Sequence, residues 1–320
     1  MSEPRVSIGM PVYNGEELLP ETLDSILAQT FDDFEVVISD NASTDGTPEI
    51  CRAYARRDKR IRYERYDRGI PIPRNFNRAF RLSRGRYFKW QAHDDLIGPE
   101  FLNHCVRILD EDLTTLLVGT RVGLIERDGS PVPLEAERGM FVTSYGEQIP
   151  VPPLVRSDAL ESPQRVERFR SVLFDIHGAV EAEYIFGLFR SAALGATPLN
   201  QGYIGAGKVL LARLSLVGRF REVTEQLFFR RYHPGHAGAS PGGTWLGHVR
   251  LAKAFAPDRR LMLFPFGRQV GGYFQAIHDA DITAPEKVRC GAIVMEKVAD
   301  VGVERVKRMP TRIREAVTRR

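Results

Sequence analysis

The acidic pair Asp94 and Asp95 is the part of the sequence best suited to chemistry. The pair follows the run GRYFKW at 85–90, which is typical of a strand that enters a core. Mg²⁺ and Mn²⁺ are held by one or two protein carboxylates and complete their shells with water and substrate phosphates, so a strand-end pair suits such a cation. The alternative is that Asp94 and Asp95 cap a helix that begins near Pro99.

Strand and helix patterns alternate over the first third of the chain, around these acids. Apolar runs predict strands at 5–11, 34–39, 61–64 and 85–90, and helical patterns separate them. Such alternation implies a parallel sheet covered by helices on both faces. Ligands of these sheets bind outside the carboxyl ends of the strands, so the polar segments 11–14, 40–45 and 93–95 should meet in one crevice.

These segments resemble the family 2 glycosyltransferases, inverting sugar-nucleotide enzymes with the GT-A fold. The matching motifs are PVYN at 11–14, DNASTDGT at 40–47, RNFN at 74–77 and HDD at 93–95, the last in the place of the family's Asp-X-Asp metal motif. The resemblance implies an α/β fold of GT-A type, with a mostly parallel doubly wound sheet and a C-terminal helical appendage. We predict a nucleotide-sugar-binding half at 1–112, an acceptor-binding half at 113–240 and the appendage at 241–320.

The resemblance also implies how the donor is bound. Residues assigned to the nucleotide and sugar are Pro11, Tyr13, Asn14 and Asp40 around the base and ribose, and Arg74 and Asn75 at the pyrophosphate or donor sugar. A guanidinium suits the pyrophosphate because it offers two parallel donors. An exposed helix cap and a surface charge are the alternative for Arg74 and Asn75.

Within the metal motif, the resemblance implies that Asp95 binds the metal and that Asp94 holds the donor sugar or an outer-shell water. His93 replaces the first acid of the motif, where its imidazole can bind a ribose hydroxyl or a phosphate. Downstream, Arg231 and His233 form a basic turn after an apolar strand. We expect Arg231 to neutralise the diphosphate and His233 to complete the metal shell or contact the diphosphate, with an exposed turn as the alternative.

The position of the general base is where the sequence departs from the family's pattern. The family's reaction displaces the diphosphate at the anomeric carbon while a base takes the acceptor proton. Relatives carry this acid at the start of a helix that corresponds to 203–214, where the chain has Gly207. Another acid (Glu181, Glu183 or Asp175), proton loss to water, or weakened catalysis would each explain the glycine. We select Glu183, because 180–189 is typical of a strand under the donor site, although a solvated edge charge is the alternative.

Composition narrows the class of protein. The chain has 320 residues, of which 43% are hydrophobic, enough for a large core, and no apolar run approaches the ~20 residues of a membrane span. No signal segment precedes the first strand, so we expect a cytoplasmic protein with reduced, buried cysteines. The basic tail from Val301 is either an amphipathic helix on the inner membrane face or a solvated terminal helix. No basic-aromatic platform indicates nucleic-acid binding.

The sequence thus predicts a metal-dependent, inverting glycosyltransferase that uses Mn²⁺ or Mg²⁺. Its donor would be a nucleoside diphosphate sugar and its acceptor a glycan, a lipid-linked molecule or a small molecule. Helical patterns at 245–297 would pack on the sheet or on a second subunit of a homo-oligomer. The alternative function is a sugar-nucleotide-binding protein with weakened or lost catalysis. Dinucleotide and P-loop enzymes are disfavoured because their glycine motifs are absent.

Overall fold

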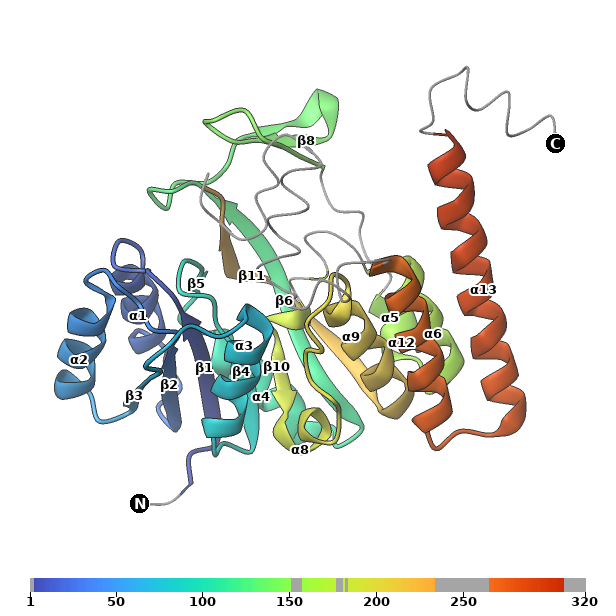
Figure 1. Cartoon of the computed structure of the whole chain (residues 1–320), viewed down its shortest axis with the longest axis horizontal. Coiled ribbons are helices and arrows are strands. Elements are labelled where there is room, and N and C mark those ends of the chain that lie inside the picture. The colour runs from blue at the N-terminus through green and yellow to red at the C-terminus, as the bar shows by residue number, and fades with distance from the viewer. Residues whose placement is uncertain (1–2, 151–156, 177–180, 182–183, 234–264, 308–320) are drawn as a thin grey trace.

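A mixed sheet runs through the centre of the protein (Figure 1). The computed structural model describes residues 3–150, 157–176, 181, 184–233 and 265–307. In these residues the strands of the sheet are β1 (Val6–Val12), β2 (Phe34–Asp40), β3 (Ile61–Arg65), β4 (Tyr87–Trp90), β5 (Leu96–Ile97), β6 (Thr115–Ile125), β10 (Leu188–Arg190) and β11 (Arg219–Arg231). They lie in the order β3-β2-β1-β4-β10-β6-β11-β5.

The strands β1 to β4 are parallel, so their carboxyl ends share one edge. Strand β1 pairs in parallel with β2 and β4, and β2 pairs in parallel with β3. Strand β10 is antiparallel to both β4 and β6, whereas β6 and β11 are parallel and β5 closes the sheet antiparallel to β11. The predicted mostly parallel, doubly wound sheet of GT-A type is confirmed.

Two apolar cores flank the sheet, because successive strand residues point to opposite faces. Tyr87 belongs to the first core and Phe88 to the second, and Leu188 and Phe189 divide in the same way. The first core is covered by α1 (Leu19–Leu27), α2 (Thr47–Arg57) and α4 (Phe101–Glu111). The second is covered by α3 (Ile72–Leu82), α6 (Arg165–Phe174) and α9 (Ala206–Val217), with the shorter helices α5 (Ser157–Glu161) and α8 (Ser191–Gly195) nearby.

The C-terminal helices α12 (Pro265–Asp279) and α13 (Ala284–Lys307) extend the second core. They lie side by side at one end of the molecule, opposite α1 and α2 (Figure 1). Tyr273 and Ile277 of α12, and Cys290 and Val294 of α13, are buried in that core. The helical pattern predicted at 249–255 and the tail beyond Lys307 fall outside the described residues. In the described part of the chain, no helix is both long enough and apolar enough to cross a membrane.

A small antiparallel sheet projects from the end of β6. Its strands are β7 (Leu134–Glu135), β8 (Met140–Val142) and β9 (Gln148–Pro150), with a 3₁₀ turn at Ala136–Arg138, and it stands above the tips of β6 and β11 (Figure 1). Strands and loops thus form residues 113–150 of the half predicted to bind the acceptor, and α5 lies further along the chain.

The predicted strand at 180–189 is wrong in its first part. Tyr184 and Ile185 are helical, and only Leu188–Arg190 forms a strand. The chain can approach β6 closely at Gly187, where a Cβ would come within 2.5 Å of the Val118 carbonyl oxygen. The strand begins directly after this glycine. The three cysteines are buried and unbridged, as predicted.

Candidate active site

Asp94 and His233 meet at the carboxyl edge of the sheet. The Asp94 Oδ2 and His233 Nε2 atoms are 3.2 Å apart, and the two side chains keep 15% and 13% of their surfaces exposed. Asp94 lies in the turn between β4 and β5, and His233 follows β11. Burial acts to raise the pKa of Asp94, but the hydrogen bond with His233 and the nearby His93 outweigh it and hold the pKa below its ordinary value.

Asp95 is the more enclosed member of the acidic pair. The residue is 5% exposed, and its Oδ1 accepts a hydrogen bond of 2.8 Å from the backbone N–H of Arg231. Its carbonyl oxygen accepts another from Gln91 Nε2 at 2.8 Å. Burial and the neighbouring Asp94 carboxylate raise the pKa of Asp95. The sequence analysis placed Asp95 at the metal and Asp94 beside it, whereas Asp94 is the more accessible of the two carboxylates.

The buried side chain of Arg231 stabilises the turn that carries Asp94 and Asp95. Its side chain is fully buried, and its Nε donates to the Asp94 carbonyl at 2.8 Å. The Nη1 group donates to the Arg127 carbonyl at 2.6 Å, and Nη2 donates to Glu21 Oε2 at 2.7 Å. The expectation that Arg231 neutralises a diphosphate is therefore not supported, because an enclosed guanidinium with these partners presents no surface to a ligand.

Asp40 also has a different position from the one expected at the base and ribose. The residue has no exposed surface, and its Oδ1 accepts a hydrogen bond of 2.9 Å from the Ser43 N–H. Its Oδ2 accepts one from the Tyr63 hydroxyl at 2.6 Å and forms an ion pair with Arg65 Nε at 3.2 Å. One carboxylate oxygen thus fixes the loop after β2, and the other binds two side chains of β3.

Arg74 and Asn75 differ in what they can reach, although they are adjacent at the start of α3. Arg74 is exposed, whereas Asn75 is 3% exposed and is bonded to β2. The Ser39 hydroxyl donates to Asn75 Oδ1 at 2.6 Å, and Asn75 Nδ2 donates to the Ser39 carbonyl at 2.9 Å. Of the two, only Arg74 is placed to meet a phosphate in the surrounding solvent.

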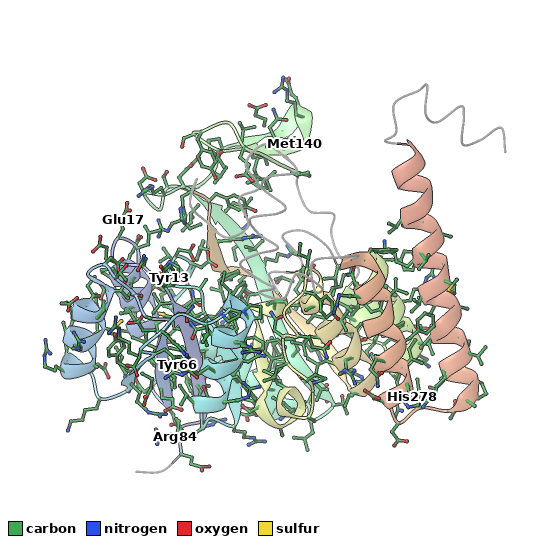
Figure 2. The ribbon with its side chains drawn as sticks, viewed as in Figure 1. Tyr13, Glu17, Tyr66, Arg84, Met140 and His278 are labelled. Carbon is green, nitrogen blue, oxygen red and sulfur yellow. The ribbon has the colours of Figure 1, made fainter. Side chains whose placement is uncertain are left out.

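The PVYN segment forms the other wall of the site. Pro11 is buried, while Tyr13 is 54% exposed and lies at the opposite end of the parallel strands from Arg84, which precedes β4 (Figure 2). Asn14 has a positive φ of 50°, and its Oδ1 accepts a hydrogen bond from the Thr44 N–H at 2.8 Å. Asn14 therefore shapes the loop after β2, and Tyr13 is the residue of this segment that offers an aromatic face.

Gly15 brings this wall into contact with the acidic turn. A Cβ at Gly15 would lie 2.5 Å from Cδ2 of His93, so the imidazole occupies the space that a side chain would need. The carbonyl of His93 also accepts a hydrogen bond of 2.9 Å from Thr22 Oγ1 in α1. The glycine and the histidine together set the spacing between the two loops.

The candidate bases have three different positions. Glu183 lies outside the described residues, and Asp175 caps the C-terminal end of α6. Glu181 lines a cavity next to the first turn of α9, where Gly207 stands. The structure thus places an acid near Gly207, although it is not the one selected from the sequence.

Lys89 is a buried charged residue that the sequence analysis did not identify as important. It is fully buried in β4, where its Nζ donates to the carbonyl oxygens of Phe186 and Trp90 and lies 4.5 Å from the ring centroid of Phe101. Burial lowers the pKa of Lys89 from its ordinary 10.5 to about 7. The sequence feature that could have identified Lys89 is its position between two aromatic residues in a predicted buried strand.

The depressed pKa of Lys89 makes stability dependent on pH. From about pH 7 to about pH 10.5 the unfolded chain binds a proton that the folded chain lacks, so the free energy of unfolding rises with pH. Relative to Lys89→Met, the native protein should gain roughly 2 kcal/mol between pH 7 and 9. Urea unfolding of both proteins across this range measures the gain, and a difference that stays constant with pH would contradict it.

Comparisons with known proteins agree with the fold and the motifs. The family model for glycosyl transferase family 2 matches residues 7–164. An uncharacterized glycosyltransferase of Rickettsia typhi, RT0329, is 35% identical over 108 residues, which are 34% of this chain and 33% of the relative. A putative glycosyltransferase of Bacillus subtilis, EpsE, is 33% identical over 129 residues, which are 40% of this chain and 46% of the relative. The match thus spans less than half of either relative.

Two solved structures share the fold at low sequence identity. TarS 1–349 of S. aureus, in complex with UDP, has a TM-score of 0.58 at 16% identity and covers 91% of this chain and 70% of its own. The mannosyltransferase PcManGT of Pyrobaculum calidifontis, in complex with GDP-Man and Mn²⁺, has a TM-score of 0.53 at 15% identity. The match covers 99% of this chain and 79% of PcManGT. Residues 7–164 of this chain therefore match glycosyl transferase family 2 in sequence.

Proposed function

We propose that this protein transfers a sugar from a nucleoside diphosphate to an acceptor hydroxyl, with inversion at the anomeric carbon and with Mn²⁺ or Mg²⁺ as cofactor. The observation that carries the proposal is the Asp94–His233 pair at the carboxyl edge of the parallel strands, where ligands of such sheets bind. The related folds support it, because TarS binds UDP and PcManGT binds GDP-Man with Mn²⁺.

The residues of this edge fit a divalent cation that is shared with the substrate. Among the described residues, no group of three or more His, Cys, Asp or Glu forms a metal cage. Mg²⁺ and Mn²⁺ sites commonly use one or two carboxylates and take their remaining ligands from water and phosphates. Asp94 and His233 would hold the cation, and Asp95 would fix the turn through Arg231. When bound, the cation would neutralise the charge of the departing diphosphate.

The exposed residues around the edge would bind the rest of the donor. Tyr13 would lie against the base and Arg74 would face the pyrophosphate, since both are exposed. His93 would bind a ribose hydroxyl or a phosphate from its place beside Gly15. Asp40 and Asn75 would act by holding the loops that carry these groups.

Gly15→Ala tests whether the position of His93 matters for the donor. The added methyl group must displace the imidazole, so we expect nucleoside diphosphate binding to weaken about tenfold, with a stability loss of about 1–3 kcal/mol. Gly46→Ala is the matched control, because the nearest atom there is the end of the Glu16 side chain, which can move. Calorimetry with UDP and GDP in the presence of Mn²⁺ measures both variants. Equal binding by the two would exclude a role for this contact.

A panel of nucleoside diphosphates and their sugars tests the function itself. Calorimetry with and without Mn²⁺ should show binding that strengthens with the metal, and NMR of the product should show an inverted anomeric configuration. Binding without any donor turnover would favour the alternative, a sugar-nucleotide-binding protein. Absence of binding by every nucleotide would contradict both functions.

A further inference from the structure

A largely apolar cavity lies between α3, the end of β4 and the start of α9. Its volume is about 280 Å³. The lining side chains include Phe76, Trp90, Ile185, Tyr203 and Leu210, and among the described lining residues Glu181 is the only acid. Trp90 is the last residue of β4, the strand that leads into the turn with Asp94 and Asp95, so the cavity adjoins the end of that strand.

Glu181 occupies the space that Gly207 leaves. Its Oε1 atom lies 3.1 Å from the position that a Cβ at residue 207 would have, and Ile185 Cδ1 lies 3.3 Å from it. A larger residue at 207 would push the carboxylate away from the first turn of α9. The glycine and the acid therefore complement each other, and the carboxylate stands where this helix meets the cavity.

The surroundings of Glu181 raise the pKa of its carboxyl group. Burial raises its pKa, while Lys208 of α9 and Arg230 of β11 act in the opposite direction. Tyr273 of α12 is the other titratable group that interacts with it. A carboxylate whose pKa moves toward the working pH is a more effective general base.

We propose, on the basis of the transferase function above, that Glu181 is the general base and that the cavity binds an acceptor whose reacting hydroxyl adjoins an apolar group. The acceptor oxygen forms a bond to the anomeric carbon while the bond from that carbon to the diphosphate oxygen breaks. The hydroxyl proton passes to the Glu181 carboxylate, and the electron pair leaves with the nucleoside diphosphate. Aromatic and aliphatic side chains around one carboxylate suit an alkyl or aryl group better than a second sugar.

Glu181→Gln tests the base, with turnover of the donor that the nucleotide panel identifies. We expect kcat to fall about 10²- to 10⁴-fold, while the Kd of the nucleoside diphosphate with Mn²⁺ stays unchanged. In the native protein kcat should rise with pH through the raised pKa of Glu181, and this rise should be absent from the variant. Glu161→Gln is the matched control, because Glu161 is also half-buried with a raised pKa but lies outside the cavity.

A second variant separates catalysis from folding. In a Glu181→Ala background, where the shorter side chain empties this space, Gly207→Glu returns a carboxylate to it and should restore part of the kcat that Glu181→Ala loses. Native kcat in Glu181→Gln would overturn the assignment of the base and leave the proposed function intact. Failure of the unmodified protein to bind any nucleotide would instead overturn the proposed function.

Methyl, phenyl and octyl β-D-glucosides test the apolar half of the proposal. With nucleoside diphosphate and Mn²⁺ present, calorimetry should show that the phenyl or octyl compound binds at least about tenfold more tightly than the methyl compound. The phenyl and octyl arms distinguish aryl from alkyl acceptors. Ile204→Trp, at a 37%-exposed lining residue, should fill the cavity and remove the preference. Equal binding of the three compounds, or no saturable binding, would overturn the proposal that the cavity binds an apolar group of the acceptor.

Discussion

Asp94→Asn is expected to lower kcat for donor turnover about 10²- to 10³-fold, because the amide keeps the shape of the side chain but loses the negative charge that a cation requires. The side chain is within 3.2 Å of His233 and has exposed surface, so a ligand can reach it. Titration with Mn²⁺ during turnover measures the effect, and half-saturation should move to higher metal concentration.

Asp95→Asn is the matched control for this loss. Its amide oxygen can still accept the hydrogen bond from the Arg231 N–H, so the turn should survive and kcat should change much less. The reverse result, with Asp95→Asn inactive and Asp94→Asn active, would return the metal to Asp95, as the sequence suggested. The pair of variants therefore decides between two neighbouring carboxylates.

Arg231→Met should destabilise the protein by about 3–5 kcal/mol, because it leaves the carbonyls of Asp94 and Arg127 and the Glu21 carboxylate without their buried partner. Lysine should not restore the loss, since a single ammonium cannot reproduce the forked geometry of the guanidinium. Urea unfolding measures the free energy of each variant.

Arg127→Met is the control for Arg231. The Arg127–Glu17 ion pair is exposed, with 54% and 58% of the side-chain surfaces accessible, so its removal should leave the free energy of unfolding nearly unchanged. If the two methionine variants lose the same stability, the buried network around Arg231 contributes no more than a surface ion pair.

The sequence predicted the first half of the fold because local patterns determine it. The strand at 34–40 is largely apolar, the strand at 61–65 alternates apolar and charged residues, and the two pair in a regular parallel register. The short strands were harder to predict. The β5 strand has two residues, and its partner Phe228 lies about 130 positions further along the chain, so no local pattern marks it.

The sequence predicted which segments meet at the carboxyl edge of the parallel strands, but not what each side chain contacts there. Asp40, Asn75 and Arg231 are polar residues at strand or helix ends, as ligand-binding residues are, yet their groups bind the protein's own backbone and side chains. A sequence cannot distinguish these cases, because the same donors and acceptors serve loops and ligands. Glu181 was one of several acids in the sequence, and only its proximity to Gly207 separates it from them.

Arg231 contacts residues that lie far from it in the sequence, and this affects when the protein can fold during its synthesis. The family match ends at residue 164, and a polypeptide cut there keeps the acidic pair but lacks β11, His233 and the guanidinium beneath the turn. Such a fragment would lack β10 and β11, which pair with the two edges of β6, and would leave Asp94 without its histidine. During synthesis, the acidic turn can therefore acquire its final shape only after residue 233 has left the ribosome, so the smallest unit that can fold on its own is considerably longer than the region that the family model matches.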